Sequence, residues 1–322
     1  MSLPQLYALI EEDMRSVDAV IRAQLRSEVV LINQVAEYIV AGGGKRMRPA
    51  LVLLAAGSLG YRGKQHHDLA ALVEFIHTAT LLHDDVVDES HLRRGRETAN
   101  ALFGNAASVL VGDFLYTRSF QMMVRLDRMY IMQVLSDATN IIAEGEVLQL
   151  MNCHDPNVDE AGYLQVIRYK TAKLFEAAAR LGAIIADAPP EVETRLAAYG
   201  MHLGTAFQLV DDVLDYSGEE ADTGKHLGDD LAEGKPTLPL IYVMQHGAPA
   251  EAAAVRHAIE TGGRDDFPAV LAAIHATGAL EHARRRARDE AGKAENAISQ
   301  LPDSQYKKAL LELAVFSVER SH

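Results

Sequence analysis

Two acidic motifs of the same form, Asp-Asp-x-x-Asp, restrict the fold of this chain more than any other feature. The first runs from Asp84 to Asp88 and the second from Asp211 to Asp215, and both follow apolar runs. On a helix, residues i and i+4 lie about 40° apart, so the outer aspartates of each motif share one face. Like charges on one face destabilise a helix unless a cation compensates them. The motifs therefore predict two helices whose C-terminal ends bind metal.

Hard oxygen ligands in such clusters suit Mg²⁺, which commonly binds one or two carboxylates together with phosphate oxygens. The alternative is a pair of solvated acidic patches, but Leu81 and Leu82 precede the first motif and Val210 precedes the second. Carboxylates at a helix C-terminus also oppose the helix dipole, and a rule broken twice in the same way indicates function. The candidate metal ligands are Asp84, Asp85, Asp88, Asp211, Asp212 and Asp215.

The composition predicts an all-α protein. Of the 322 residues, 48% are hydrophobic and 24% charged, which is ordinary for a globular chain, and the formal charge of −14 argues against nucleic acid as a partner. Helix-forming residues dominate, and no segment has the alternation of a strand. We expect ten or more helices in a single domain over residues 1–322. The long, central helices are expected near Leu69–Asp88, Ala99–Leu126, Met129–Met151, Tyr163–Ala186 and Glu191–Asp215.

No targeting or redox motif is evident. Residues 1–15 lack the features of a signal peptide, and the longest apolar run, Pro49–Gly60, is too short to span a bilayer. We expect a cytoplasmic protein without stable membrane insertion. Cys153 is the single cysteine, which rules out an intrachain disulfide and favours an incidental thiol. His66 and His67 are expected in a polar loop and lack the spacing of zinc ligands.

A glycine-rich turn with three cations, Gly42–Pro49, leads into an apolar helix. Glycines permit close backbone approach, and a helix N-terminus favours anions. Lys45 and Arg48 could together clamp a diphosphate. The alternative is a helix ending in glycine with a solvated basic tail. The spacing is not that of a Walker loop.

Further basic residues could bind the phosphate groups that a metal at the aspartate motifs would hold. Arg93 and Arg94 follow Asp88 closely enough to bind phosphate oxygens that a metal holds from the other side. Gln208 shares a helix face with the first two aspartates of the second motif. His77 lies seven residues before the first motif and should face the same cavity, although a core histidine is the commoner explanation. His83 is assigned no role. The remaining candidates are Lys170, Thr171, Lys173, Lys225 and Lys235. For the lysines, the ordinary alternative is a solvated position on the surface.

Together these segments resemble the trans-polyprenyl diphosphate synthase family of head-to-tail prenyltransferases, and most of all its bacterial octaprenyl branch. The resemblance covers nearly the whole chain in the order of the family. It rests on GGGKRMRP (42–49), EFIHTATLLHDDVVDESHLRRG (74–95), GDFLYTRSF (112–120), KTAKLFEAA (170–178), GTAFQLVDDVLD (204–215) and GDDLAEGKPTLPL (228–240).

The resemblance implies an isoprenoid-synthase-type helical bundle around a deep central cavity, usually as a homodimer. It implies that three Mg²⁺ hold an allylic diphosphate, such as farnesyl diphosphate, between the two motifs, and that isopentenyl diphosphate is added to give octaprenyl diphosphate for the ubiquinone side chain. The implied catalytic residues are Asp84, Asp88, Asp211 and Lys170, with Asp212 and Asp215 in support. Those implied to face the allylic diphosphate are Arg93, Lys170, Thr171, Gln208, Lys225 and Lys235. Those implied to hold isopentenyl diphosphate are Lys45, Arg48, His77 and Arg94.

The chemistry follows from charge. Ionising an allylic diphosphate separates a carbocation from an anionic leaving group, which metal ions and basic side chains stabilise. The double bond of isopentenyl diphosphate captures the cation, and a proton is lost. No side chain is an obvious base, so the departing pyrophosphate is the expected acceptor.

Product length is expected to depend on the helix of the first motif. Ala79 and Thr80 are small and would leave a tunnel open, which disfavours a short product. Phe120, Met122 and Met123 are candidates for its floor, with ordinary core packing as the alternative. Octaprenyl, nonaprenyl (solanesyl) and shorter products remain open.

Two rival functions remain. A class I terpene cyclase also binds Mg²⁺ through an Asp-Asp-x-x-Asp helix, but would usually lack the glycine-rich turn, His77 and a second such motif. A non-catalytic subunit of a heteromeric synthase should have damaged motifs, whereas both are complete here.

Overall fold

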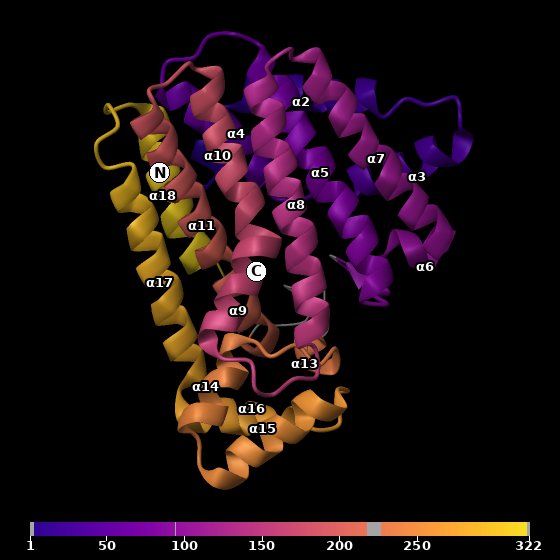
Figure 1. Ribbon diagram of the computed structural model, residues 1–322, viewed down its shortest axis with the longest axis vertical. Helices are drawn as coiled ribbons and strands as arrows, with labels where there is room; N and C mark the ends of the chain where they lie inside the picture. Colours follow the sequence, from indigo (N-terminus) through magenta and orange to yellow (C-terminus); the bar gives the residue numbers. More distant parts are fainter. Residues whose placement is uncertain (1–2, 94, 218–226, 321–322) are drawn as a thin grey trace. The chain divides into compact units, whose positions relative to one another are not determined.

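The computed structural model describes residues 3–93, 95–217 and 227–320 (Figure 1). Regular structure in these residues is helical except for one pair of two-residue strands, which confirms the all-α prediction. Two compact units are present. The first comprises Met1–Thr139, Leu174–Gly200 and Ala297–Leu313, and the second comprises Asn140–Lys173, Met201–Asn296 and Ala314–His322. The single domain predicted over residues 1–322 stays a prediction.

The first unit is built around helix α5, which packs against α2, α4 and α7. Its elements are α1 (Leu3–Leu9), α2 (Glu11–Gln24), α3 (Val30–Ala41), α4 (Met47–Ser58), α5 (Gln65–Val87), β1 (Leu92–Arg93), β2 (Arg96–Glu97), α6 (Ala99–Phe103), α7 (Asn105–Arg125) and nearly all of α10 (Lys173–Ile185). Helices α4 and α5 are apolar on most sides and largely buried, which explains their central place.

Two expectations for this unit were wrong in detail. Helix α5 begins at Gln65, so His66 and His67 lie in its first turn and not in a loop. The single helix expected over residues 99–126 is divided at Gly104, whose φ of 87° does not continue a helix.

Helices α5 and α7 approach each other closely at Gly112. A Cβ atom there would lie 2.4 Å from Nε2 of His83, so the imidazole would have to move to admit a side chain. The sequence suggested no role for His83. Nε2 of its imidazole lies 3.2 Å from the backbone oxygen of Val109.

The second unit holds the second aspartate motif. Its elements are α9 (Glu160–Ile167), the π-helical segment η1 (Arg168–Ala172), α13 (Asp229–Ala232), α14 (Leu238–His246), α15 (Pro249–Thr261) and α16 (Phe267–Thr277). The last three pack on one another through buried aliphatic side chains that include Val243, Val255, Ile259 and Ile274. Four long helices contribute residues to both units: α8 (Met129–Asn152), α11 (Pro190–Ser217), α17 (Ala279–Ala297) and α18 (Gln305–Glu319). None of the helices in the described ranges has the length and apolar character needed to cross a membrane.

Candidate active site

The three aspartates of the first motif differ in their surroundings. Asp84 belongs to the last turn of α5, and Asp88 directly follows the helix. Asp85 points elsewhere and is 4% exposed. Its Oδ1 accepts hydrogen bonds from Nε of Arg93 at 2.8 Å and from Nη2 at 2.6 Å. The central aspartate is therefore neutralised within the protein.

Arg93 owes its position to the β1–β2 hairpin, in which Leu92 pairs with Glu97 and Arg93 with Arg96. The turn uses Gly95 at a φ of 72°. Burial alone lowers the pKa of Arg93, but the carboxylates of the motif, Asp85 above all, raise it above the usual value. The guanidinium thus stays charged. Arg94 lies outside the described residues.

The glycine-rich turn runs through left-handed backbone conformations. Gly43 has a φ of 64° and Arg46 a φ of 48°, which is costly for a residue with a side chain. The side chain of Arg46 is held by Glu74 at 2.9 Å. The hydroxyl of Tyr7 donates to the backbone oxygen of Lys45. The turn is thereby fixed at two of its three basic residues, Lys45 and Arg46.

Two residues predicted to bind the same substrate meet beyond this turn. Nη1 of Arg48 lies 3.1 Å from Nε2 of His77. The Arg48 guanidinium also lies 4.4 Å from the centre of the Phe175 ring, a cation–π arrangement that orients it. The structure therefore brings Arg48 and His77 together.

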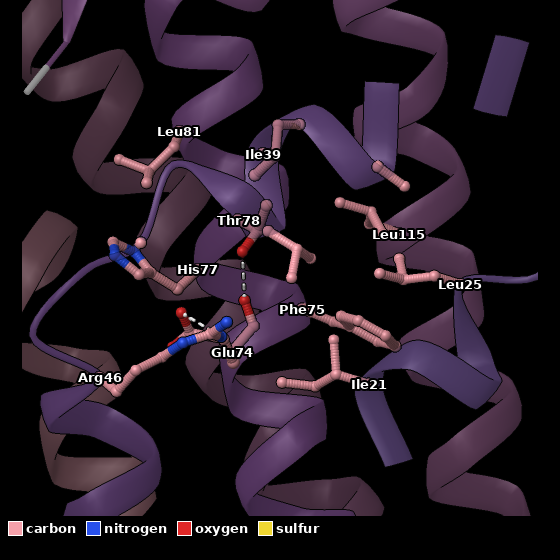
Figure 2. A pocket seen from close by; sticks show the side chains of 13 residues that line it. Ile21, Leu25, Ile39, Arg46, Glu74, Phe75, His77, Thr78, Leu81 and Leu115 are labelled. Carbon is pink, nitrogen blue, oxygen red and sulfur yellow. Dashed lines mark hydrogen bonds and ion pairs between the residues drawn. The ribbon is translucent and has the colours of Figure 1, made fainter. Parts of the chain in front are cut away.

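A pocket opens beside α5 in this unit (Figure 2). Its empty volume is about 500 Å³, including the part open to solvent. Arg46, Glu74 and His77 form a polar side, and the rest of the wall is mainly apolar: Ile21, Leu25, Ala36, Ile39, Val40, Gly43, Phe75, Thr78, Leu81 and Leu115. Ala79 and Thr80 do not line it. The tunnel expected along those two residues stays a prediction, as does its floor at Phe120, Met122 and Met123.

In the second motif, Asp212 is the buried aspartate. Its carboxylate accepts hydrogen bonds from the hydroxyl of Tyr163 at 2.5 Å and from Nε2 of Gln208 at 2.7 Å. Gln208 in turn accepts one from the hydroxyl of Thr171 at 3.0 Å. Burial raises the pKa of Asp212 to about 8, and the nearby charge of Asp230 adds to this effect. The predicted residues Thr171 and Gln208 thus belong to a network that positions the motif.

Asp211 is paired with an arginine that the sequence did not suggest. Both terminal nitrogens of Arg320 lie 3.2 Å from its Oδ1. Arg320 is almost fully buried, donates to the backbone oxygen of Phe207 at 2.7 Å, and lies 3.8 Å from the centre of that ring. The remaining outer aspartate, Asp215, accepts from the backbone N–H of Asp230 at 3.2 Å. Arg320 follows the last helix and belongs to no motif, so the sequence contained no signal for it.

Lys170 and Thr171 lie in the π-helical segment η1, a distortion that often marks functional sites. Nζ of Lys170 is 2.6 Å from the carboxylate of Glu146 on α8. The two elements meet at Gly145, where a Cβ atom would lie 2.6 Å from the backbone nitrogen of Lys170. Lys235 pairs with Glu233. Lys225 lies outside the described residues.

Each motif thus combines a buried aspartate with outer aspartates and has an arginine next to it: Arg93 at the first and Arg320 at the second. The second has four aspartates, three of its own and Asp230, and burial with their mutual repulsion keeps Asp212 from ionising readily. This donor set fits a hard divalent cation, since such cations take oxygen ligands. Within each unit, aspartates suited to a divalent cation occur together with basic residues suited to phosphate, a combination typical of metal-dependent enzymes that act on diphosphates.

Comparison with known proteins identifies the family. The profile of the polyprenyl synthetase family matches residues 29–274. The chain belongs to this family and is a prenyltransferase.

The relatives are similar over their full lengths. The octaprenyl diphosphate synthase of Escherichia coli is 56% identical over 321 residues, which are 99% of each chain. The geranyl-diphosphate-specific all-trans-nonaprenyl-diphosphate synthase of Rhodobacter capsulatus is 45% identical, over 98% of this chain and 97% of its own. A polyprenyl synthase from Caulobacter crescentus, solved with calcium and isoprenyl diphosphate, superposes with a TM-score of 0.96 at 45% identity and covers 100% of this chain and 98% of its own. These likenesses confirm the isoprenoid-synthase helical fold.

Proposed function

We propose that the protein is a long-chain polyprenyl diphosphate synthase that adds isopentenyl diphosphate to an allylic diphosphate, such as farnesyl diphosphate, and makes octaprenyl diphosphate for the ubiquinone side chain. The observation that carries this proposal is the complete set of acidic and basic residues in a chain that is 56% identical to an octaprenyl synthase over its whole length. A nonaprenyl product is the second candidate, since a nonaprenyl synthase is 45% identical.

The two motifs are proposed to bind Mg²⁺, three ions with substrate present, through Asp84, Asp88 and Asp211, with Asp215 in support. The ions would supply positive charge to the diphosphate that leaves. Because Asp85 and Asp212 are each only 4% exposed and are held by protein donors, their proposed task is to position Arg93 and the motif of α11. The sequence made all six aspartates candidate ligands, whereas the geometry favours the four outer ones.

The basic residues are proposed to divide between the two substrates. Those for the allylic diphosphate are Arg93, Lys170, Thr171, Gln208, Lys225 and Lys235, and those for isopentenyl diphosphate are Lys45, Arg48, His77 and Arg94. The contact of 3.1 Å between Arg48 and His77 supports their joint assignment. Charged donors fixed before the bond breaks stabilise the leaving diphosphate without reorganising. The released pyrophosphate is proposed to accept the proton.

We propose further that residues 1–322 form one catalytic domain, and that the protein is a cytoplasmic homodimer. Large exposed apolar side chains on and beside α7, namely Leu110, Val124 and Met129, support a protein partner, because exposed apolar patches commonly mark interfaces.

A chain-length assay tests the function. The purified protein would be incubated with Mg²⁺, farnesyl diphosphate and labelled isopentenyl diphosphate, and the dephosphorylated products separated against prenyl alcohol standards. A predominant C40 product supports the proposal, and C45 supports the second candidate. A cyclic hydrocarbon would indicate a cyclase, and no incorporation would indicate a partner subunit.

A further inference from the structure

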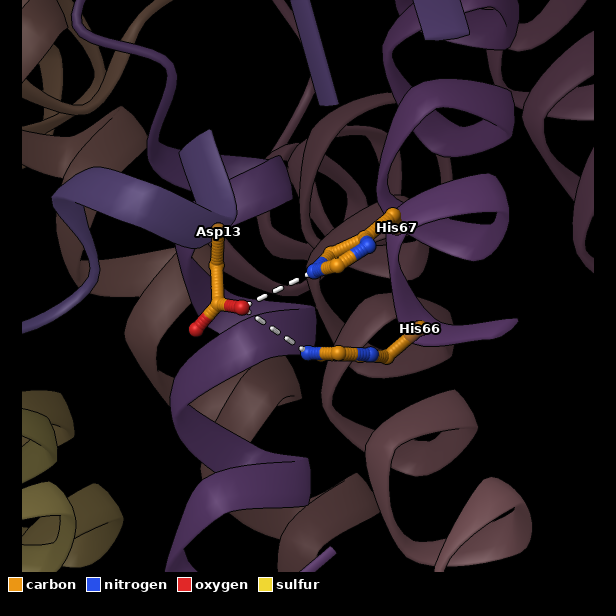
Figure 3. A group of neighbouring side chains, drawn as sticks. All are labelled: Asp13, His66 and His67. Atoms are coloured by element: carbon orange, nitrogen blue, oxygen red, sulfur yellow. Dashed lines mark hydrogen bonds and ion pairs between the residues drawn. The ribbon is translucent and has the colours of Figure 1, made fainter. Parts of the chain in front are cut away.

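A cluster of two histidines and one aspartate lies in the first unit, where α2 and α5 begin (Figure 3). Asp13 belongs to the first turn of α2, and His66 and His67 belong to the first turn of α5. Figure 3 shows both imidazole rings turning a nitrogen toward the same carboxylate. Nε2 of His67 lies 2.8 Å and Nε2 of His66 3.5 Å from Oδ1 of Asp13. Three side chains that commonly bind metals thus converge on one point.

Hydrogen bonds satisfy this group incompletely. Oδ1 of Asp13 already accepts the short bond from His67, so His66 is left with a contact at the limit of a hydrogen bond. His66 is 8% exposed, and its Nδ1 has no hydrogen-bond partner among the described residues. The nitrogen that faces Asp13 is Nε2, and a metal bound there would give it the partner that the carboxylate provides only at 3.5 Å. The edge of the His66 ring packs against Tyr61, with centroids 5.2 Å apart, which holds it facing Asp13.

The spacing fits a small divalent ion. A zinc ion bound at ~2.0–2.1 Å by tetrahedral ligands separates them by ~3.3 Å. The ligand atoms of the three side chains all lie within 4.8 Å of one another. The distance of 3.5 Å between Asp13 and His66 is close to the tetrahedral value, and the distance of 2.8 Å between Asp13 and His67 would lengthen by about 0.5 Å. Imidazole nitrogen with one carboxylate suits zinc and similar transition metals, whereas Mg²⁺ prefers oxygen.

We propose that Asp13, His66 and His67 form a transition-metal site, occupied by Zn²⁺, that fastens the start of α2 to the start of α5. Water would complete the coordination. The site is separate from the aspartate motif on the same helix, because the 17 residues from His67 to Asp84 span about 26 Å at ~1.5 Å per residue. Its task is to join the two helix starts, away from that motif.

Metal retention tests the site. Tag-free protein would be loaded with Zn²⁺, desalted in a large excess of Mg²⁺ to occupy the carboxylate motifs, and analysed for zinc. We expect one zinc per wild-type chain, and its loss in Asp13→Asn, His66→Gln and His67→Gln. His257→Gln is the matched control, because it removes an exposed histidine 4.0 Å from Asp266 and should retain the zinc. Zn²⁺ should also raise the Tm of the wild type and of the His257→Gln control, but not the Tm of the three site variants.

Two results would overturn the proposal: a wild-type chain that retains no zinc, or zinc retained equally by all variants. Should a variant fail to fold by circular dichroism, zinc X-ray absorption of the wild type decides. Two imidazole ligands support the site, and a shell without imidazole refutes it. None of these measurements depends on prenyltransferase activity, so a failure of the proposed function would be recognised separately.

Discussion

At the scale of single residues, the aspartates of each motif have different surroundings. The outer aspartates, four positions apart, share a face. A residue next to one of them lies about 100° further round the helix, and here that rotation places Asp85 and Asp212 against protein donors. The sequence predicted which residues share a face but treated all six as ligands. The same helical geometry could have distinguished Asp85 and Asp212 from the outer aspartates. Their partners Arg93 and Tyr163 could not have been assigned without the fold.

Removing an outer aspartate should disable the enzyme. We expect Asp84→Ala and Asp211→Ala each to lower turnover at least ~10²-fold, comparable to the loss of a preorganised charge-stabilising group. Steady-state assays with saturating Mg²⁺ measure the effect. Asp289→Ala, on the exposed side of α17, should be unaffected. Near-normal turnover of both motif variants would refute the metal assignment.

Arg320 is expected to act through Asp211, which it orients with both terminal nitrogens. Groups that orient a metal ligand typically contribute ~10–100-fold to metal affinity or activity. Arg320→Gln should therefore raise the Mg²⁺ concentration for half-maximal rate by about that factor, and Arg320→Lys should recover only part, since lysine lacks the planar fork. The control is Arg288→Gln, which breaks an exposed pair with Glu281. Equal Mg²⁺ dependence in the Arg320 and Arg288 variants would contradict this role.

At the scale of elements, long apolar helices were predicted well and their irregularities were not. The expected helix over residues 163–186 is helical as far as Ile185, but residues 168–172 adopt the π form. The break at Gly104 and the β1–β2 hairpin were also missed. Such features depend on one residue or on pairs of residues, which is too short for periodicity to reveal. The π segment nevertheless contains Lys170 and Thr171, which the motif had selected.

The contact between α8 and η1 should tolerate no side chain at residue 145. Gly145→Ala would place a Cβ atom 2.6 Å from the backbone nitrogen of Lys170, and we expect a loss of about 1–3 kcal/mol in unfolding free energy together with reduced turnover. Urea denaturation and steady-state kinetics measure both.

Gly292→Ala provides the matched control, because a Cβ atom at that helical glycine meets no atom within 4 Å. It should be neutral or stabilising by about 0.4–1 kcal/mol, since alanine restricts the unfolded chain. If the two alanine variants were equally stable and active, the close approach at Gly145 would have no importance.

At the scale of the whole molecule, Glu290 should influence acid stability. It is 1% exposed and meets His202 at 2.6 Å, Lys293 at 2.8 Å and Arg168 at 3.7 Å. Burial raises its pKa, but the bonds from His202 and Lys293 outweigh this and lower the pKa from 4.5 to about 2. Because the folded pKa is depressed, the stabilisation is complete above the unfolded value and is lost as the pH falls from about 4.5 toward 2.

Glu290→Gln should therefore lower the unfolding free energy at pH 7 by about 2–3 kcal/mol, and the difference from the wild type should shrink at pH 3. Urea denaturation at both pH values measures it. Glu281→Gln, at an exposed pair with Arg288, should change little. A gap of constant size at the two pH values would exclude this account.

Local patterns and a family resemblance sufficed to predict the helical class, and they supplied the two motifs and most of the basic residues from which the candidate site is proposed. They could not predict contacts between distant segments. Asp13 meets His67 across 54 residues, and Arg320 meets Asp211 across 109. His66 and His67 lack the spacing of zinc ligands in the local sequence. The third candidate ligand of the proposed site comes from another helix, which a local spacing rule does not detect.

The two end regions of the described chain are each tied to the proposed catalytic machinery. Tyr7 on α1 holds the backbone oxygen of Lys45, and Arg320 holds Asp211. A purification tag or fusion partner joined close to either residue would disturb the proposed substrate loop or the proposed metal ligand. Fusions of this synthase therefore call for long spacers, and an inactive tagged preparation would be poor evidence against the enzyme.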